Sequence, residues 1–307
     1  MMDAGRTCTE RPGRESMRIW QRWHNLRWWW RWPIKWAVVG VVAFAIVFPN
    51  PRVFLRHVDH WRDPNALIDP HLPELQPLVV ELKSALDPSL PPRKALARVQ
   101  LFVESKIPYA WDWDTWGSGD YLPTLKEALA MGREDCDGRA VVAASLLRNI
   151  GYEAELVTDL THMWVKTDRG ETMGPPRDRR KSVEGTKDGL RIHWDTIANL
   201  PRAMAYGAAV FPWPREMVLI LAVWLMTLGR GWGVVRAVIV LGLLTAGLWC
   251  LRRGGASPYD PIVWLQLAAL LHFFVAVVVA AMPALRAAWS HPPGLATASG
   301  CAAPSAD

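Results

Sequence analysis

The amino-acid sequence predicts an α+β domain combined with transmembrane helices. Its 307 residues alternate between strongly apolar blocks and one long polar stretch, as expected for a domain attached to membrane spans. Within the polar stretch, helical patterns come first and strand patterns follow, an order typical of α+β domains. We therefore expect five parts: a basic, Trp-rich cytoplasmic segment over 1–35, a transmembrane anchor over 36–55, the domain over 56–205, two to three transmembrane helices over 206–285 and a disordered tail over 286–307.

The first segment combines positive charge with tryptophan. The segment has only three acidic residues. Its basic residues are Arg6, Arg11, Arg14, Arg18, Arg22, Arg27, Arg31 and Lys35. The chain holds 19 tryptophans, many at the edges of apolar blocks, and indole prefers the headgroup region of a bilayer. Because the basic run leads straight into an apolar block, it indicates a membrane flank rather than nucleic-acid binding. The alternative is a peptide that only lies on the membrane surface. Met17 is an alternative start to Met1.

The first apolar block, Trp36–Phe48, is shorter than the roughly 20 residues of a membrane span. It reaches that length with Trp32–Ile34 before it and the stretch to Leu55 after it. A cleaved signal peptide is the alternative, but no small-x-small cleavage pattern follows the block, so we predict a retained anchor. The basic flank predicts a cytoplasmic N-terminus and a domain on the outer side, which in a bacterium is the periplasmic face of the inner membrane.

Residue periodicity and capping signals locate the elements of the domain. After a Pro-rich start, the expected elements are a helix over 93–107, a short helix from the capping box of Thr124 and Glu127 to Gly132, a helix over 137–150 stopped by Gly151, strands over 153–158 and 161–167, and a turn at 168–170.

Three apolar blocks follow the domain: Met217–Leu228, Val234–Leu251 and Ile262–Met282. The first two are separated by a short Gly-rich linker and form a hairpin if both cross the membrane. That arrangement gives four spans and a cytoplasmic C-terminus, but it places Arg252 and Arg253 on the outer side, against the positive-inside bias. If Met217–Leu228 lies in the interface instead, the number of spans falls to three. We favour four.

The four cysteines, Cys8, Cys136, Cys250 and Cys301, fall in four different segments. No disulfide framework and no cysteine-based zinc site is expected from this spacing. The sequence also lacks Gly-rich phosphate loops and metal-ligand spacings, so it predicts neither a cofactor nor a metal. Cys136 is therefore the only thiol of the predicted domain.

Cys136 and His162 are the candidate catalytic residues. Cys136 lies where a helix begins, and the partial positive charge of a helix N-terminus stabilises a thiolate. Asp135 and Asp137 oppose this effect, because like-charge repulsion raises the pKa of the thiol. The site therefore needs an imidazole, and His162 is expected on the strand over 161–167, within reach of a helix packed on the sheet.

The residues around this pair resemble the transglutaminase-like superfamily, including its bacterial cysteine-peptidase branch. The stretch Glu134–Ala140 is similar to the family's Gly-Asp-Cys-Asp-x-x-Ala helix start, with Glu134 in place of glycine. His162–Val165 is similar to the family's His-Ala-Trp-Val strand, and the resemblance covers about residues 95–175. It implies a papain-like fold, with Cys136 as nucleophile and His162 as general base and then general acid.

One member of the family's triad is missing from its usual place. An Asp that orients the imidazole is expected about a dozen residues after the His, and here Gly174 stands in that position. Asp178, Asp168 and Glu171 are the possible substitutes. The resemblance also implies that Trp111–Trp116 borders the substrate cleft, where an indole N–H could donate to an oxyanion. The alternative is that these rings pack against the bilayer surface.

Two classes of function remain open at this point. The first is a membrane-anchored thiol enzyme that acts on amide bonds, either a peptidase or an acyltransferase, at the outer membrane face. The second is a catalytically inactive module that binds or assembles through the same cleft. A transporter is disfavoured, because Arg236 and His272 are almost the only ionisable residues of the later apolar blocks. The expected partners are a peptide or protein substrate and membrane lipid, and the sequence leaves the oligomeric state open.

Overall fold

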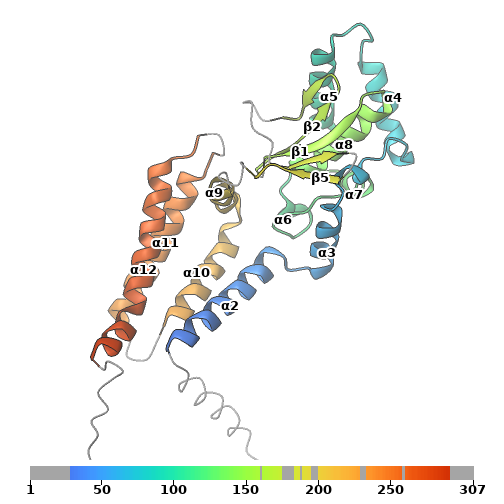
Figure 1. The fold of residues 1–307 in the computed structure, drawn as a ribbon. Helices are drawn as coiled ribbons and strands as arrows, with labels where there is room; N and C mark the ends of the chain where they lie inside the picture. The colour runs from blue at the N-terminus through green and yellow to red at the C-terminus, as the bar shows by residue number, and fades with distance from the viewer. Residues whose placement is uncertain are drawn as a thin grey trace, which may run out of the picture.

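The computed structural model describes residues 28–159, 161–174, 183–186, 189–194, 200–228, 233–257 and 260–290. The chain is mostly helical (67%), with one small antiparallel sheet and a set of apolar helices. This agrees with the predicted combination of an α+β class and helices. Figure 1 shows the sheet-containing domain above the group of long apolar helices.

The domain contains the strands of the described residues and the helices α3 to α8. Its helices are α3 (Pro51–His60), α4 (Gln76–Ala85), α5 (Pro92–Lys106), α6 (Asp112–Thr115), α7 (Leu125–Met131) and α8 (Cys136–Asn149), with 3-10 turns η1 (Pro64–Leu67) and η2 (Pro73–Leu75). Its strands are β1 (Ala154–Thr158), β2 (Met163–Thr167), β3 (Gly170–Thr172), β4 (Val183–Thr186) and β5 (Gly189–Ile192). The helices predicted over 93–107 and 137–150 are confirmed, each shifted by one residue.

Helix α2 (Trp28–Val47) is the first candidate span. It begins before the predicted Trp36, and Pro33 lies inside it. It ends before the predicted limit at Leu55, because Asn50 accepts a hydrogen bond from the Arg52 N–H and starts the new helix α3. The span therefore gains its length from the Trp-rich N-terminal side.

The later apolar blocks form α9 (Leu200–Val210), α10 (Trp213–Thr227), α11 (Val234–Gly254) and α12 (Val263–Ser290). Among the described residues, α2, α11 and α12 are each long and apolar enough to cross a membrane. The number rises to four if α9 and α10, bent by 112°, are taken as one broken span. Helix α12 also extends into the predicted tail, which from residue 291 lies outside the described residues.

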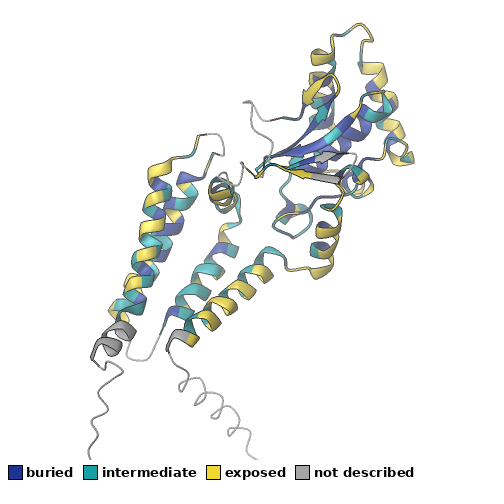
Figure 2. Cartoon of the chain, in the orientation of Figure 1, coloured by how far each residue is buried: buried dark blue, intermediate teal, exposed yellow. Residues whose placement is uncertain are grey.

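These helices expose apolar side chains outward, as lipid-facing helices do. Figure 2 shows exposed residues along the outer faces of α2, α11 and α12. Val41, Val235 and Phe274, for example, are 69%, 73% and 65% exposed. Helix α10 packs against α2 and α11, and α11 packs against α12. The arrangement fits a membrane protein, since the exposure of so much apolar surface to water would cost free energy.

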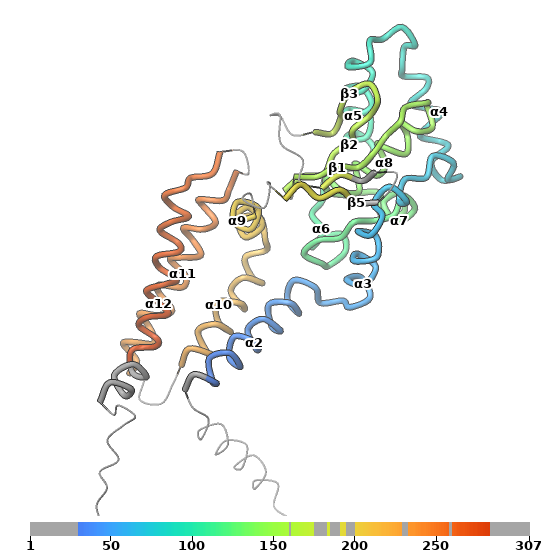
Figure 3. The backbone as a smooth tube through the Cα atoms, viewed as in Figure 1, coloured from blue at the N-terminus to red at the C-terminus, as the bar shows by residue number. Residues whose placement is uncertain are grey.

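The five strands form an antiparallel sheet in the order β3-β2-β1-β4-β5. Helix α8 packs against β1 and β2 of the sheet and against the helices α5 and α7. It is therefore the central helix of the domain, and most of its residues are buried, including Val141, Ala144 and Leu147 at 0% exposure. The tube in Figure 3 shows that the domain is inserted in the chain between α2 and the later helices.

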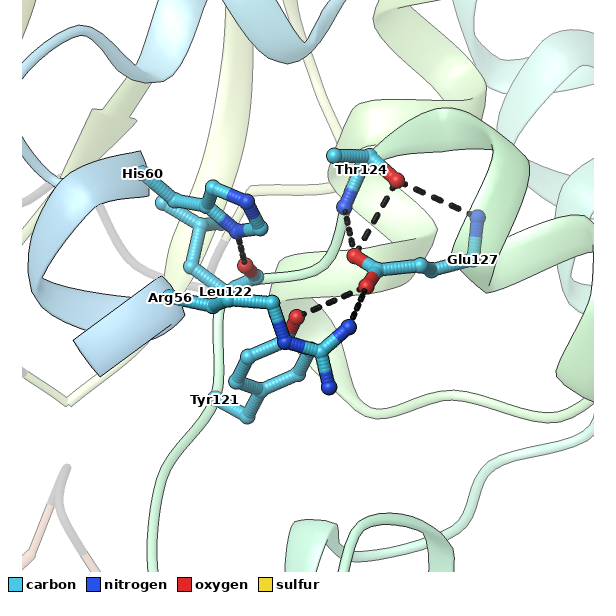
Figure 4. Close-up of polar contacts among 6 residues, drawn as sticks. All are labelled: Arg56, His60, Tyr121, Leu122, Thr124 and Glu127. Atoms are coloured by element: carbon cyan, nitrogen blue, oxygen red, sulfur yellow. Dashed lines mark hydrogen bonds and ion pairs between the residues drawn. The ribbon is translucent and has the colours of Figure 1, made fainter. Parts of the chain in front are cut away.

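A polar network ties α3, which follows the first span, to the loop that precedes α7 (Figure 4). Thr124 and Glu127 form the predicted capping box, so that part of the prediction is confirmed. Glu127 also accepts a hydrogen bond from the Tyr121 hydroxyl (2.9 Å) and pairs with Arg56 of α3 (2.5 Å). His60 contacts the Leu122 carbonyl through Nδ1 at 2.6 Å. One carboxylate thus serves both as the cap of α7 and as a link from α7 to α3, which follows the candidate span α2.

Replacing Thr124 with Ala should destabilise the domain by about 1 kcal/mol, because the Glu127 N–H loses its 3.2 Å acceptor. The measurement is urea unfolding of the full chain in detergent, followed by tryptophan fluorescence. Ser84→Ala is the matched control, since the Ser84 hydroxyl bonds to the exposed Glu81 carbonyl of its own helix. Equal losses for the two variants would contradict a capping role.

Candidate active site

Cys136 is the first residue of α8, as predicted, and Asp135 is the N-cap. The Asp135 Oδ1 atom accepts the Asp137 N–H at 2.9 Å, which fixes the first turn of the helix. The Cys136 Sγ atom lies 3.3 Å from Asp137 Oδ1, to which the thiol donates. The Met163 N–H at the start of β2 lies close enough to this sulfur to lower the pKa of the thiol. Cys136 therefore lies where the start of α8 packs against the start of β2.

The surroundings of Cys136 favour the neutral thiol. Burial raises the pKa of the thiol well above its ordinary value, and the charges of Asp135 and Asp137 raise it further. The Met163 N–H lowers the pKa, but it does not outweigh these effects. As predicted, the helix N-terminus and the two aspartates act on the pKa of the thiol in opposite directions, and the net effect is a raised pKa. A thiolate at neutral pH requires a base that removes the proton.

His162 lies immediately before β2 rather than on the strand, so the prediction of a strand position is wrong by one residue. Asp159 fixes the backbone before this position, because its Oδ1 atom accepts hydrogen bonds from the N–H groups of Thr161 (2.9 Å) and His162 (3.0 Å). The imidazole stacks near the Trp164 indole, with ring centroids 6.4 Å apart. This local turn ends the pairing of β1 with β2 and directs the side chain toward the cleft that Cys136 also lines.

The Met173 carbonyl sets the tautomer of His162. The His162 Nε2 atom lies 2.7 Å from the Met173 oxygen. A carbonyl only accepts, so Nε2 carries the hydrogen, and a neutral imidazole then keeps its acceptor lone pair on Nδ1. Met173 has a φ of +59°, in the left-handed region that a non-glycine residue rarely adopts. This conformation aims the carbonyl of a residue just beyond β3 at the imidazole.

Helix α5 supports that backbone conformation. The Leu96 carbonyl accepts a hydrogen bond from the Thr172 hydroxyl at 3.0 Å. One turn later, the Gln100 Oε1 atom accepts the Met173 N–H at 3.3 Å, and the Gln100 amide donates to Glu104 at 2.9 Å. No sequence signal pointed to Gln100, because its relation to His162 exists only after β3 packs on α5.

The three acids considered as substitutes for the missing triad member have different positions. Asp168 accepts the Glu153 N–H (3.1 Å) and pairs with Arg169, and Glu171 accepts the Trp164 indole N–H (2.9 Å). Both carboxylates thus serve other partners. Asp178 lies outside the described residues. A Cβ added at Gly174, which stands at the expected Asp position, would contact the Trp164 indole at 3.6 Å.

Buried carboxyl groups gather behind Cys136. Asp112, Glu134 and Asp135 each place an oxygen within 4.8 Å of the others, a spacing at which carboxylates could share a cation. This cluster was not predicted from the sequence, since Asp112 is far from the other two along the chain. Burial and the neighbouring charges raise the pKa of Glu134 to about 8 and that of Asp135 to about 7. Shared protons therefore reduce the negative charge of the cluster near neutral pH.

A cleft of about 970 Å³ opens beside Cys136 and His162. Trp111 and Trp113 line it, with their rings stacked 4.8 Å apart, and Trp113 also meets Phe211 beyond α9 edge to face. The Trp111 and Trp113 rings therefore border this cleft, and Trp113 also contacts the residue that follows α9. The Trp116 indole N–H is directed to Glu134 instead (3.4 Å).

Searches against protein-family models, curated proteins and solved structures found no match to this chain. The resemblance to the transglutaminase-like superfamily therefore depends on the motifs around Cys136 and His162.

Replacing Glu134 with Gln should stabilise the protein increasingly as the pH rises. The carboxyl ionises near pH 4 in the unfolded chain but only near about 8 in the folded one, so the folded state binds more protons between these values and loses stability with rising pH. The neutral amide of the variant is free of this loss. We expect its advantage in unfolding free energy to grow by about 3.5 kcal/mol between pH 5 and pH 8, measured by thermal unfolding in detergent.

The matched control for this experiment is Glu74→Gln, at a half-exposed carboxylate near Lys126. It should leave the pH dependence of the wild type unchanged. If the advantage of the Glu134 variant is the same at all pH values, Glu134 is ionised in the folded protein and the shared-proton account is wrong.

Proposed function

We propose that this chain is a membrane-anchored transglutaminase-like thiol enzyme that acts on amide bonds through a Cys136–His162 dyad. One observation carries the proposal: His162 is held through Nε2 by the Met173 carbonyl in the same cleft that Cys136 lines. The packing of α8 on the antiparallel pair of β1 and β2 is compatible with a papain-like arrangement. The basic N-terminal flank supports a domain at the outer face of the membrane.

The chemistry follows from the tautomer. His162 Nδ1 takes the proton of the Cys136 thiol, which relieves the cost of forming a thiolate beside Asp135 and Asp137. The sulfur attacks the carbonyl carbon of an amide, and the imidazolium then gives its proton to the departing amine. Water or a second amine releases the acyl group from the sulfur. The Met173 carbonyl plays the orienting part that an aspartate plays in the related triad, without its negative charge.

Thiol labelling tests the proposal directly. Iodoacetamide should modify Cys136 of the full chain in detergent well below pH 8.5, the pKa of an ordinary thiol, and His162→Ala should remove this reactivity. Mass spectrometry of the modified peptide distinguishes Cys136 from Cys250, which is buried in α11. His193→Ala is the matched control, because His193 faces Glu184 at 3.5 Å and does not line the cleft.

A second function is favoured if Cys136 reacts only as an ordinary or slower thiol. Burial and two adjacent aspartates already raise its pKa. In that case the dyad does not form an ion pair, the enzyme proposal fails, and the domain is an inactive binding or assembly module.

Gln100 should act as a positioning residue for His162. Gln100→Ala removes the acceptor of the Met173 N–H, so the Met173 carbonyl loses its fixed direction. We expect the labelling rate of Cys136 near pH 7 to fall by about tenfold, equivalent to one lost hydrogen bond of about 1.4 kcal/mol, with the pH profile shifted upward.

Ser105→Ala on the same helix is the control, since its hydroxyl bonds to the Phe102 carbonyl. A uniform loss of labelling at all pH values, with an unshifted profile, would indicate a merely structural role for Gln100.

A further inference from the structure

We propose that the substrate of the Cys136 site is a long-chain acyl amide that enters the cleft from the membrane. Its hydrocarbon chain would lie along α9 and α10, and its carbonyl carbon would meet the Cys136 sulfur. This inference rests on the proposed thiol chemistry and adds to it the class of substrate.

The two walls of the cleft differ in origin and in chemistry. The domain supplies Cys136, His162 and its acidic neighbours. The opposite wall is supplied by the apolar helices: Val47 ends α2, Met204 and Gly207 lie on α9, Phe211 follows α9, and Leu219 lies on α10. A catalytic cysteine thus faces a hydrocarbon-like surface across a cavity of about 970 Å³, near the upper end of the size range of small-molecule sites.

The cleft is fixed at the membrane boundary by direct contacts between the two parts. The Gly119 N–H donates to the Val47 carbonyl at 2.7 Å, and Arg215 at the start of α10 donates to the Gly117 carbonyl at 3.2 Å. A side chain at Gly119 would begin 2.6 Å from the Val47 Cγ1 atom, so glycine permits this close approach. The domain therefore meets the helices at the end of the first span.

Helix α9 runs across the direction of the spanning helices. It is bent by 112° from α10, and in Figure 1 it is seen nearly end-on while α10, α11 and α12 run lengthwise. Arg252 at the end of α11 holds this bend, because it donates to the carbonyls of Ala208 (3.1 Å) and Phe211 (2.8 Å) and pairs with Glu216. These bonds give a structural role to Arg252, which the four-span arrangement places on the outer side against the positive-inside bias. Met204, 66% exposed, leaves α9 open to an incoming chain.

The charge of the cleft selects the polar end of the substrate. Asp112, Asp120, Asp135 and Asp137 line it, and its described lining residues include no Lys or Arg. Such a site offers an anionic phosphate headgroup no cationic partner, whereas it accepts a neutral or cationic one. An acyl amide meets this condition, and its nitrogen is the leaving group that the imidazolium can protonate. In the reaction, the amide C–N bond breaks, a thioester C–S bond forms, and the Cys136 proton leaves with the amine through His162.

The test uses maleimides of different chain length on the full chain in detergent micelles, with mass spectrometry at Cys136. Gly207→Phe should block the chain-binding wall, since no atom lies within 4 Å of a Cβ added there. We expect it to slow labelling by N-dodecylmaleimide about tenfold, because the buried methylenes lose their apolar contacts, and to leave N-ethylmaleimide labelling within about twofold. The probe partitions into micelles to the same extent with wild type and variant, so this partition does not affect the ratio of their labelling rates.

Gly242→Phe in α11 is the matched control, as Gly242 has the same open surroundings outside the cleft. It should leave both labelling rates unchanged. Equal slowing of the two maleimides by Gly207→Phe, or no slowing of either, would overturn the inference.

A second measurement needs no variant. N-dodecanoylglycinamide should protect wild-type Cys136 from N-ethylmaleimide at concentrations where N-acetylglycinamide does not, and dodecyl phosphate should protect less. Equal protection by the two amides would point to a substrate from solution and overturn the inference. Failure of the thiol chemistry is seen separately, in the pH profile of N-ethylmaleimide labelling, which does not depend on chain length.

Discussion

Helix α8 is buried along most of its length between the sheet and the helices α5 and α7, and the other elements of the domain are arranged around it. Its contacts with β1, β2, α5 and α7 fix its position, because most of its residues are buried and closely packed. The position of Cys136 follows from this packing. The thiol stands at the end of a rigid element, next to the start of β2, where its reactivity is set by neighbours rather than by its own motion.

Two electrostatic effects compete at that end of the helix. The helix N-terminus and the Met163 N–H favour a thiolate, whereas burial and the adjacent aspartates disfavour it. Protonation of the cluster formed by Asp112, Glu134 and Asp135 reduces the repulsion, since the pKa values of Glu134 and Asp135 are raised to about 8 and about 7. The reactivity of the thiol therefore depends on how many of these carboxyl groups are protonated and on His162, and not on the cysteine alone.

The attachment of the domain to the apolar helices gives the cleft its second wall. The chain enters the domain from α2 and returns through α9 and α10, so the two ends of the domain lie against the same group of helices (Figure 3). Contacts of Gly119 with Val47 and of Arg215 with Gly117 fix this attachment. A domain on a long flexible linker would have a cleft facing water on both sides. Here the helices that hold the domain also form the second wall of the cleft.

The features that could be predicted from the sequence are those that local interactions decide. The apolar blocks, the capping box of Thr124 and Glu127, the helix that starts at Cys136 and the strands that follow it all depend on residues close together in the chain. The limits of α2, the position of His162 before β2 and the bend between α9 and α10 depended on turns that periodicity does not reveal. Tertiary packing was needed to place the Met173 carbonyl on His162, to join Asp112 to Glu134, and to set the apolar wall opposite Cys136. Each of these relations joins residues from different elements, and it is the packing of α5, α8 and α9 that brings them together.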